Sequence, residues 1–185
     1  FMLDGGAGAD TLAVTGTPVA DSINLAPLAA PLPDGINHGD IEIVNLNLAA
    51  GADTLNVTLA PNVIYTLDAG ADADTLSLIA TASADTITII PTSFTWGTSI
   101  LNYSNANLEN LSLNSGGGDD ILSITPGANL IYTLDCDAGV DALTVFGSAG
   151  AGDFAVSSSA VTFDGPTTIN YSNTENLTVD GAAGS

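Results

Sequence analysis

The hydrophobic residues of this chain recur at alternate positions in short segments, each of which begins just after an acidic residue. In residues 10–14, Leu12 and Val14 share one side of the alternation, whereas Thr11 and Ala13 take the other. The same alternation occurs in residues 53–57, 74–78, 85–89, 109–113 and 175–179. Period-two alternation over five residues predicts a β-strand with one buried face. Clusters of Gly, Asn, Asp and Pro separate the segments, and about sixteen such strands fit the chain, with no connection long enough for a crossover helix.

Two nested spacings organise these segments into an internal repeat. The acidic residues Asp53, Asp74 and Asp85 are 21 and 11 residues apart, so the elementary step is about 11 residues and two steps make about 22. The only glutamates occupy one slot of a longer repeat of about 66 residues: Glu42, Glu109 and Glu175. We therefore divide the chain into super-repeats at residues 3–66, 67–133 and 134–185.

Short strands at constant spacing are compatible with a β-sandwich, a β-propeller or a β-solenoid. A sandwich predicts uneven hairpin loops and a propeller predicts repeats of about 40–50 residues, whereas here the same residue type returns at equivalent places. We therefore predict an all-β fold, a parallel β-solenoid with about 22 residues per coil and three coils per super-repeat, in a single domain over residues 1–185. The scarcity of Glu, Met, Gln, Lys and Arg also argues against helices.

The charge composition excludes several classes of partner. The chain has 21 acidic residues, no Lys or Arg, and a formal net charge of −21. Binding to nucleic acid or to an anionic membrane surface requires cations, so we expect neither partner. The longest apolar-looking run, residues 25–33, is interrupted by Pro27 and Pro31. We therefore expect no direct membrane insertion.

Every side chain that could take part in catalysis occupies a position that the repeat pattern explains. His38 aligns with a tyrosine in each later super-repeat, and Cys136 aligns with small residues. Neighbouring carboxylates occur in a recurring repeat slot, whereas an acid–base pair requires two unlike environments. We therefore expect no enzyme activity and assign no catalytic residue.

The acidic residue before each strand is a candidate ligand for a cation. Stacked coils would bring these carboxylates together, and the chain has no Lys or Arg to relieve their repulsion. Calcium, which binds carboxylate and carbonyl oxygens, would relieve it. Residues 5–13 match the nonapeptide GGxGxDxUx in full, and residues 69–77 and 115–123 match it in part. The chain therefore resembles the calcium-binding repeat regions of RTX proteins, which are large secreted bacterial proteins.

This resemblance implies an extracellular β-solenoid in which Asp10, Asp74 and Asp120 are Ca²⁺ ligands, with Asp53 and Asp141 as further candidates in the same slot. RTX nonapeptides follow one another directly, whereas the motif returns here only after about 21, 22 or 45 residues. The regular lattice of calcium sites in that family is therefore not carried over. The alternative is that each Asp caps backbone N–H groups in a turn and binds no metal.

Three Asn-x-Ser/Thr sequons place their asparagine on the outward side of a predicted strand: Asn56, Asn110 and Asn176. They are candidate glycosylation sites if the source organism glycosylates asparagine. The alternative is that Asn suits the turns and strand exits of a solenoid.

The two ends of the chain carry the same motif. Residues 180–185 (DGAAGS) resemble residues 4–9 (DGGAGA), and neither end looks like the polar cap of a natural solenoid. The chain opens without an initiator Met or a signal peptide, as an internal or processed piece of a longer repeat protein or filament would. We therefore expect a structural protein of the cell surface or extracellular space whose copies associate head to tail. The alternative is a calcium-dependent adhesion or binding module of a large secreted protein.

Overall fold

The alternating segments of the sequence form β-strands. The computed structural model describes residues 1–29, 31–104, 107–147, 154–163 and 167–181. These residues form 19 β-strands and no helix. In the described parts of the chain there is accordingly no helical segment suited to crossing a bilayer. The prediction of an all-β protein is confirmed.

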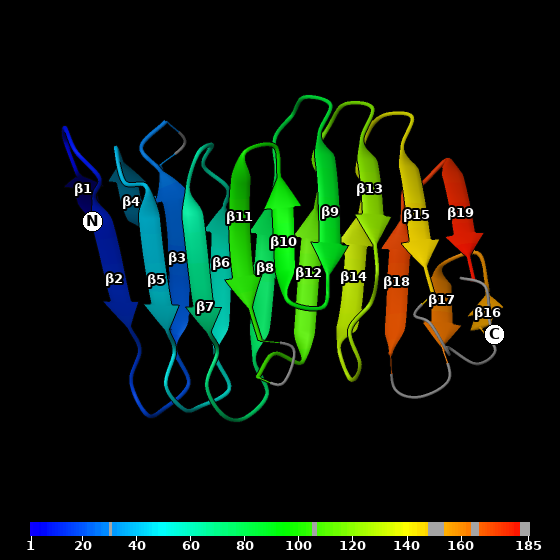
Figure 1. The fold of residues 1–185 in the computed structure, drawn as a ribbon, viewed down its shortest axis with the longest axis horizontal. Helices are drawn as coiled ribbons and strands as arrows, with labels where there is room; N and C mark the ends of the chain where they lie inside the picture. Colours follow the sequence, from blue (N-terminus) through cyan, green and yellow to red (C-terminus); the bar gives the residue numbers. More distant parts are fainter. Residues whose placement is uncertain (30, 105–106, 148–153, 164–166, 182–185) are drawn as a thin grey trace.

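The strands lie in two sheets, which we call the ten-stranded and the nine-stranded sheet (Figure 1). The ten-stranded sheet has the spatial order β1 (Met2–Asp4), β4 (Ile36–Gly39), β3 (Ser22–Pro27), β6 (Thr54–Thr58), β8 (Thr75–Ile79), β12 (Asn110–Asn114), β14 (Ile131–Asp135), β18 (Thr168–Ser172), β17 (Ala160–Phe163) and β16 (Phe154–Val156). The nine-stranded sheet has the order β19 (Asn176–Asp180), β15 (Ala142–Phe146), β13 (Ile121–Ile124), β9 (Thr86–Ile90), β10 (Ser93–Trp96), β11 (Ser99–Tyr103), β7 (Ile64–Asp68), β5 (Ile43–Asn47) and β2 (Thr11–Thr15).

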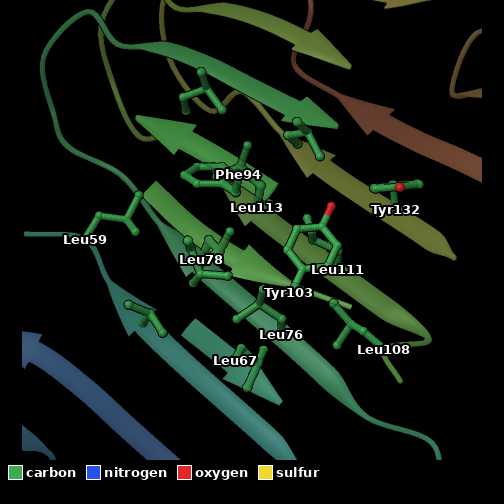
Figure 2. Packing of buried hydrophobic residues seen from close by; sticks show 14 of the residues in the cluster. Leu59, Leu67, Leu76, Leu78, Phe94, Tyr103, Leu108, Leu111, Leu113 and Tyr132 are labelled. Carbon is green, nitrogen blue, oxygen red and sulfur yellow. The ribbon is translucent and has the colours of Figure 1, made fainter. Parts of the chain in front are cut away.

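The chain passes from one sheet to the other between most successive strands, and strands of the same sheet then pair in parallel. β5 pairs with β7 in the nine-stranded sheet, and β6 pairs with β8 in the ten-stranded sheet. The register keeps equivalent residues opposite one another, so the inward side chains stack in rows. One row crosses the ten-stranded sheet and is at most 1% exposed: Leu55, Leu76, Leu111, Tyr132 and Ile169. Figure 2 shows the packing around Leu76, Leu111 and Tyr132 in the core between the sheets.

Two antiparallel insertions interrupt the parallel pairing. β10 pairs antiparallel with both β9 and β11, and β17 pairs antiparallel with both β16 and β18. After β9, Pro91 begins a turn and Gly97, with a φ of +55°, allows a second tight turn, so the chain returns within the same sheet. The expectation of uniformly parallel pairing is wrong at these two places.

These insertions change the symmetry of the super-repeat. Three coils of about 22 residues would return each equivalent strand to the same sheet. Instead, β7 and β14, which share the sequence IYTLD, lie in the nine-stranded and the ten-stranded sheet. The strands that follow Glu42, Glu109 and Glu175 alternate between the sheets in the same way. In the first super-repeat β3 is followed by β4 in the same sheet, and in the later two the antiparallel hairpin has the same effect. Each super-repeat therefore has one crossing fewer between the sheets and is related to the next by a half-turn about the long axis.

His38 occupies a slot that the later super-repeats fill with tyrosine. The Tyr103 hydroxyl donates a hydrogen bond to the Ile90 carbonyl at 2.7 Å, and the Tyr171 hydroxyl donates to the Ser157 carbonyl. His38 is buried, but its Nε2 has no hydrogen-bond partner among the described residues. The imidazole borders a cavity of about 370 Å³. The shorter side chain therefore leaves space and an unsatisfied polar atom where tyrosine would reach a carbonyl.

Replacing His38 should both stabilise the fold and alter its pH dependence. We expect His38→Tyr to raise the free energy of unfolding by about 1 kcal/mol near neutral pH, because the phenol can fill the cavity and donate a hydrogen bond. Burial lowers the pKa of His38, so the folded state binds fewer protons than the unfolded state. Wild-type stability is then lost as the pH falls below about 6.5, the pKa of unfolded His.

Urea unfolding of both proteins above and below that pH measures the effect. Tyrosine does not titrate in this range, so the stability difference between His38→Tyr and wild type should widen at the lower pH. A difference that is the same at both pH values would contradict the assignment of a neutral, buried His38.

Candidate functional site

Carboxylates stack in rows at the starts of the strands. Asp21, Asp53 and Asp74 immediately precede β3, β6 and β8. The Asp21 N–H donates to Asp53 Oδ1 at 2.7 Å, and the Asp53 N–H donates to Asp74 Oδ1 at 2.8 Å. The row ends at Glu109, whose Oε2 accepts from the Asp74 N–H at 2.8 Å. Each carboxylate after Asp21 thus receives the backbone N–H of the same slot in the neighbouring strand.

A second row runs along the nine-stranded sheet with the same geometry. The Asp85 N–H donates to Asp120 Oδ1 at 2.8 Å, the Asp120 N–H to Asp141 Oδ1 at 2.7 Å, and the Asp141 N–H to Glu175 Oε2 at 2.8 Å. A short third row joins the Asp10 N–H to Glu42 Oε2 at 2.7 Å. Every glutamate of the chain therefore accepts the backbone N–H of the last aspartate in a row. This hydrogen bond is the physical role of the glutamate position that recurs about every 66 residues in the sequence.

The structure distributes the predicted calcium ligands over separate rows. Asp10, Asp74 and Asp120 each belong to a different row, whereas Asp53 neighbours Asp74 and Asp141 neighbours Asp120. Among the described residues, no group of three or more His, Cys, Asp or Glu side chains is arranged to hold a metal ion. The hydrogen bonds are those expected for aspartates that cap backbone N–H groups. In Asp53, Asp74 and Asp141, the Oδ1 atom accepts a backbone N–H. This capping role does not explain what the Oδ2 atom of the same carboxylate binds.

The second oxygen of several row carboxylates is buried and has no partner among the described residues. Asp53, Asp74 and Asp141 are at most 1% exposed, and the Oδ2 atom of each lacks a hydrogen bond. The Asp10 Oδ2 atom is in the same condition. A buried unpaired carboxylate oxygen costs free energy, and the chain has no Lys or Arg to compensate. A proton or a cation from solution would reduce this cost.

Burial also shifts the titration of two row members. It raises the pKa of Asp74; the Asp53 N–H partly opposes this shift, and the negative charges of Asp53 and Glu109 add to it. Burial likewise raises the pKa of Asp120, although the Ser115 hydroxyl and the Asp85 N–H lower it in part. Both carboxylates are therefore held in surroundings that disfavour their charge.

Some row members receive donors that the repeat pattern did not indicate. The Ser115 hydroxyl donates to Asp120 Oδ2 at 2.6 Å, so that carboxylate is satisfied on both oxygens. The Trp96 indole N–H donates to Asp85 Oδ1 at 2.7 Å, and the Thr81 hydroxyl donates to Asp85 Oδ2 at 2.8 Å. Trp96 reaches Asp85 only because β10 folds back on β9, a pairing that the spacing of the repeat did not predict.

The glycines beside the rows let neighbouring backbones approach closely. Gly70 has a φ of +97°, and a Cβ atom added there would lie 1.8 Å from the Ala49 carbonyl oxygen. A side chain at this position is therefore excluded on steric and conformational grounds. The glycine-rich stretch before Asp74 serves the close stacking of strands whether or not an ion binds.

The candidate glycosylation asparagines lie on strands near the rows. Asn110 and Asn176 donate weakly to the backbone carbonyls of Asp74 and Asp141, both at 3.4 Å. Asn56 donates to Asn24 Oδ1 at 2.8 Å. Asn176 is exposed, and Asn56 and Asn110 are half-buried. All three keep the outward direction that strand parity predicts, and glycosylation of them stays a prediction.

No family model, curated protein or solved structure matches the chain.

Substitution of Asp74 should separate the capping role from the charge. Asp74→Asn keeps an oxygen to accept the Asp53 N–H and removes a buried charge, so we expect stability within about 0.5 kcal/mol of wild type, or above it. Asp74→Ala leaves the buried Asp53 N–H without an acceptor and should cost about 1–3 kcal/mol. Chemical denaturation measures both variants.

The exposed Asp68 carboxylate at the end of β7 provides the matched control. We expect Asp68→Ala to change stability by less than about 0.5 kcal/mol, as surface substitutions commonly do. Equal losses for the Asn and Ala variants of Asp74 would show that charge, rather than the hydrogen bond, stabilises this slot.

Proposed function

We propose that this chain is a structural protein of the cell surface or extracellular space, a β-solenoid whose copies join head to tail into a fibre. The observation that carries the proposal is the continuity of the core: inward apolar side chains and backbone pairs repeat from strand to strand up to both ends of the sheets. The aspartates that are candidate calcium ligands all lie in the carboxylate rows, and Cys136 is buried in the core. The proposal therefore includes no enzyme activity.

The edge strands support self-association because their inward side chains are incompletely covered. Leu76 and Leu78 on β8 are at most 1% exposed, whereas Leu12 and Val14 occupy the same slots on the edge strand β2 and are only half-buried. Leu177 and Val179 are half-buried on the edge strand β19. An open edge with uncovered apolar side chains is a template for further strand pairing.

The extracellular placement is supported by composition. The chain carries a net charge of −21 with no Lys or Arg, so proteases that cleave after basic residues have no site in it. A strongly acidic surface also suits a protein that must stay dispersed until its ends meet. The copies that join are either separate subunits or successive units of one longer chain.

Assembly should depend on the edge of β19. We expect wild-type protein to form oligomers whose size grows with concentration in sedimentation velocity, and filaments in electron micrographs. Val179→Asp places a charge without a counterion at the proposed junction and should leave the protein monomeric, with its β-sheet circular dichroism retained.

Thr133→Asp provides the control with the same change in charge. Thr133 is exposed on β14, away from both sheet ends, so this variant should assemble as wild type does. Wild-type protein that stays monomeric at high concentration would overturn the proposed function.

A second function, a calcium-dependent adhesion or binding module, is favoured by one observation. The buried Oδ2 atoms of Asp10, Asp53, Asp74 and Asp141 have no hydrogen-bond partner among the residues that the structure describes. A hard divalent cation takes carboxylate and carbonyl oxygens as ligands. In this reading, Asp10, Asp74 and Asp120 bind Ca²⁺, with Asp53 and Asp141 contributing through their positions beside Asp74 and Asp120.

Calcium titration decides between the two functions. If the rows bind Ca²⁺, saturating calcium should raise the free energy of unfolding by about 2.7 kcal/mol at a concentration 100 times the Kd, and a chelator should reverse the gain. Asp74→Asn should then lose part of the gain. Unchanged stability across the calcium titration would leave the aspartates as backbone caps alone.

A further inference from the structure

We propose that the cavity beside His38 is a binding site for a small uncharged phenol, whose hydroxyl group takes the place that a tyrosine hydroxyl holds in each later super-repeat. The residues that line the cavity all lie within the first super-repeat, and no edge strand contributes to it. This inference goes beyond the proposed function and does not depend on self-association.

Three segments of the chain enclose the cavity, which has a volume of about 370 Å³. They are residues 27–29 at the end of β3, residues 38–42 at the end of β4, and residues 60–63 in the turn between β6 and β7. In this lining His38 is buried and Asp40 is exposed, so the cavity reaches from the core to solvent. Its volume is within the range of about 300–1,000 Å³ that is typical of small-molecule sites.

His38 contributes a polar atom that the described residues leave unsatisfied. The residue is 2% exposed, and its Nε2 atom has no hydrogen-bond partner among them. The ring is held in place by an edge-to-face contact with Tyr65, with centroids 6.2 Å apart, and the His38 carbonyl accepts the Leu28 N–H at 2.8 Å. A buried polar atom without a partner costs free energy. A ligand that forms a hydrogen bond with Nε2 would remove this cost.

The later super-repeats indicate which chemical group fits beside this position. Tyr103 and Tyr171 stand where the first super-repeat has His38. The hydroxyl of each donates a hydrogen bond to a backbone carbonyl, that of Ile90 for Tyr103 and that of Ser157 for Tyr171. The imidazole lacks this hydroxyl, so a phenol supplied from solution would restore the missing hydrogen-bonding group.

The repeat also locates the missing hydroxyl in the cavity. Ile90 directly precedes Pro91 in residues 85–91 (DTITIIP), and Ala26 directly precedes Pro27 in the matching residues 21–27 (DSINLAP). Pro27 lines the cavity. The carbonyl that a tyrosine hydroxyl would reach in the first super-repeat therefore belongs to the residue beside the cavity wall.

The lining favours a hydroxyl group on an apolar body. Burial lowers the pKa of His38, so the imidazole is neutral at neutral pH and has one nitrogen that donates and one that accepts. A hydroxyl can both donate and accept, so it satisfies Nε2 in either tautomer. Leu28, Pro61 and Val63 offer apolar contacts for the rest of the ligand.

The charges around the cavity select against an anionic ligand. Asp40 and Glu42 line it, and the chain has no Lys or Arg to attract an anion. A cation would be attracted to carboxylates all over a chain of net charge −21, so charge does not single out this cavity for a cation. A phenol is uncharged near neutral pH, as the tyrosine side chain is.

Nuclear magnetic resonance of the imidazole tests the site directly, because His38 is the only histidine of the chain. Titration with phenol should shift the ¹⁵N signal of Nε2 and saturate with a Kd of about 1 mM, as expected for so small a ligand. Toluene, which lacks the hydroxyl, should bind about fivefold more weakly. 4-Hydroxybenzoate, which adds a negative charge, should also bind more weakly than phenol.

His38→Tyr provides a variant in which the chain itself fills the cavity. Calorimetry should show phenol binding to this variant weakened at least about tenfold, while its β-sheet circular dichroism is retained. Thr66→Tyr is the matched control, because it adds the same side chain at an exposed position of β7 that does not line the cavity. This control should bind phenol as wild type does.

A saturable shift of Nε2 with phenol, together with loss of binding in His38→Tyr alone, would support the site. An Nε2 signal that phenol leaves unchanged would overturn the inference and indicate that water satisfies this atom. Equal binding of phenol to wild type and His38→Tyr would place the phenol elsewhere and overturn it as well. Equal affinity for toluene and phenol would overturn the role of the hydroxyl. None of these outcomes bears on head-to-tail association, which sedimentation velocity measures separately.

Discussion

Parallel pairing with equivalent residues opposite one another is the constraint on which the rest of this structure depends. It stacks each side chain on its counterpart at a spacing of about 4.8 Å, so a residue type that suits one strand must suit its neighbours. Leu55, Leu76 and Leu111 stack within the core, and the same rule stacks Asp53 on Asp74 outside it. Favourable apolar contacts and unfavourable like charges therefore arise from one geometric cause.

The carboxylate rows show how that conflict is moderated. Each Asp or Glu after the first residue of a row accepts a backbone N–H at 2.7–2.8 Å, and such hydrogen bonds to a charged group are stronger than neutral ones. The rows are also short, because Val63 and Leu130 stand in the slot after Glu42 and Glu109. Repulsion is thus limited to a few neighbours, and Asp120 is relieved further by the Ser115 hydroxyl.

Sequence alone predicted the features that depend on local alternation and on repeat spacing. Strands beginning at Thr11, Thr54, Thr75 and Thr86 lie where period-two alternation placed them, and Asp53, Asp74 and Asp85 before the last three cap N–H groups. It did not predict the hairpin through β10, because residues 93–96 and 99–103 alternate like any other strand. A proline turn alone does not distinguish the two outcomes, because Pro61 begins the turn that crosses from β6 to β7, whereas Pro91 begins the turn that returns from β9 to β10 in the same sheet. The contact of Trp96 with Asp85 follows from that hairpin. The half-turn between super-repeats follows from such returns within one sheet, which β3 and β4 make without a hairpin.

The half-turn has a consequence for the surface of any fibre built from this chain. Such a fibre would have a direction, because all its copies point the same way along the axis, yet it would have no distinct front and back. Because equivalent strands exchange sheets from one super-repeat to the next, each type of outer surface would appear on alternate sides along the fibre. A ligand or neighbouring fibre that recognises one type of surface could therefore bind from either side. Within the chain, two super-repeats span the seven strand spacings from β5 to β19, about 34 Å. After that distance the same strand type faces the same way again, which sets the axial period at which such lateral contacts could recur.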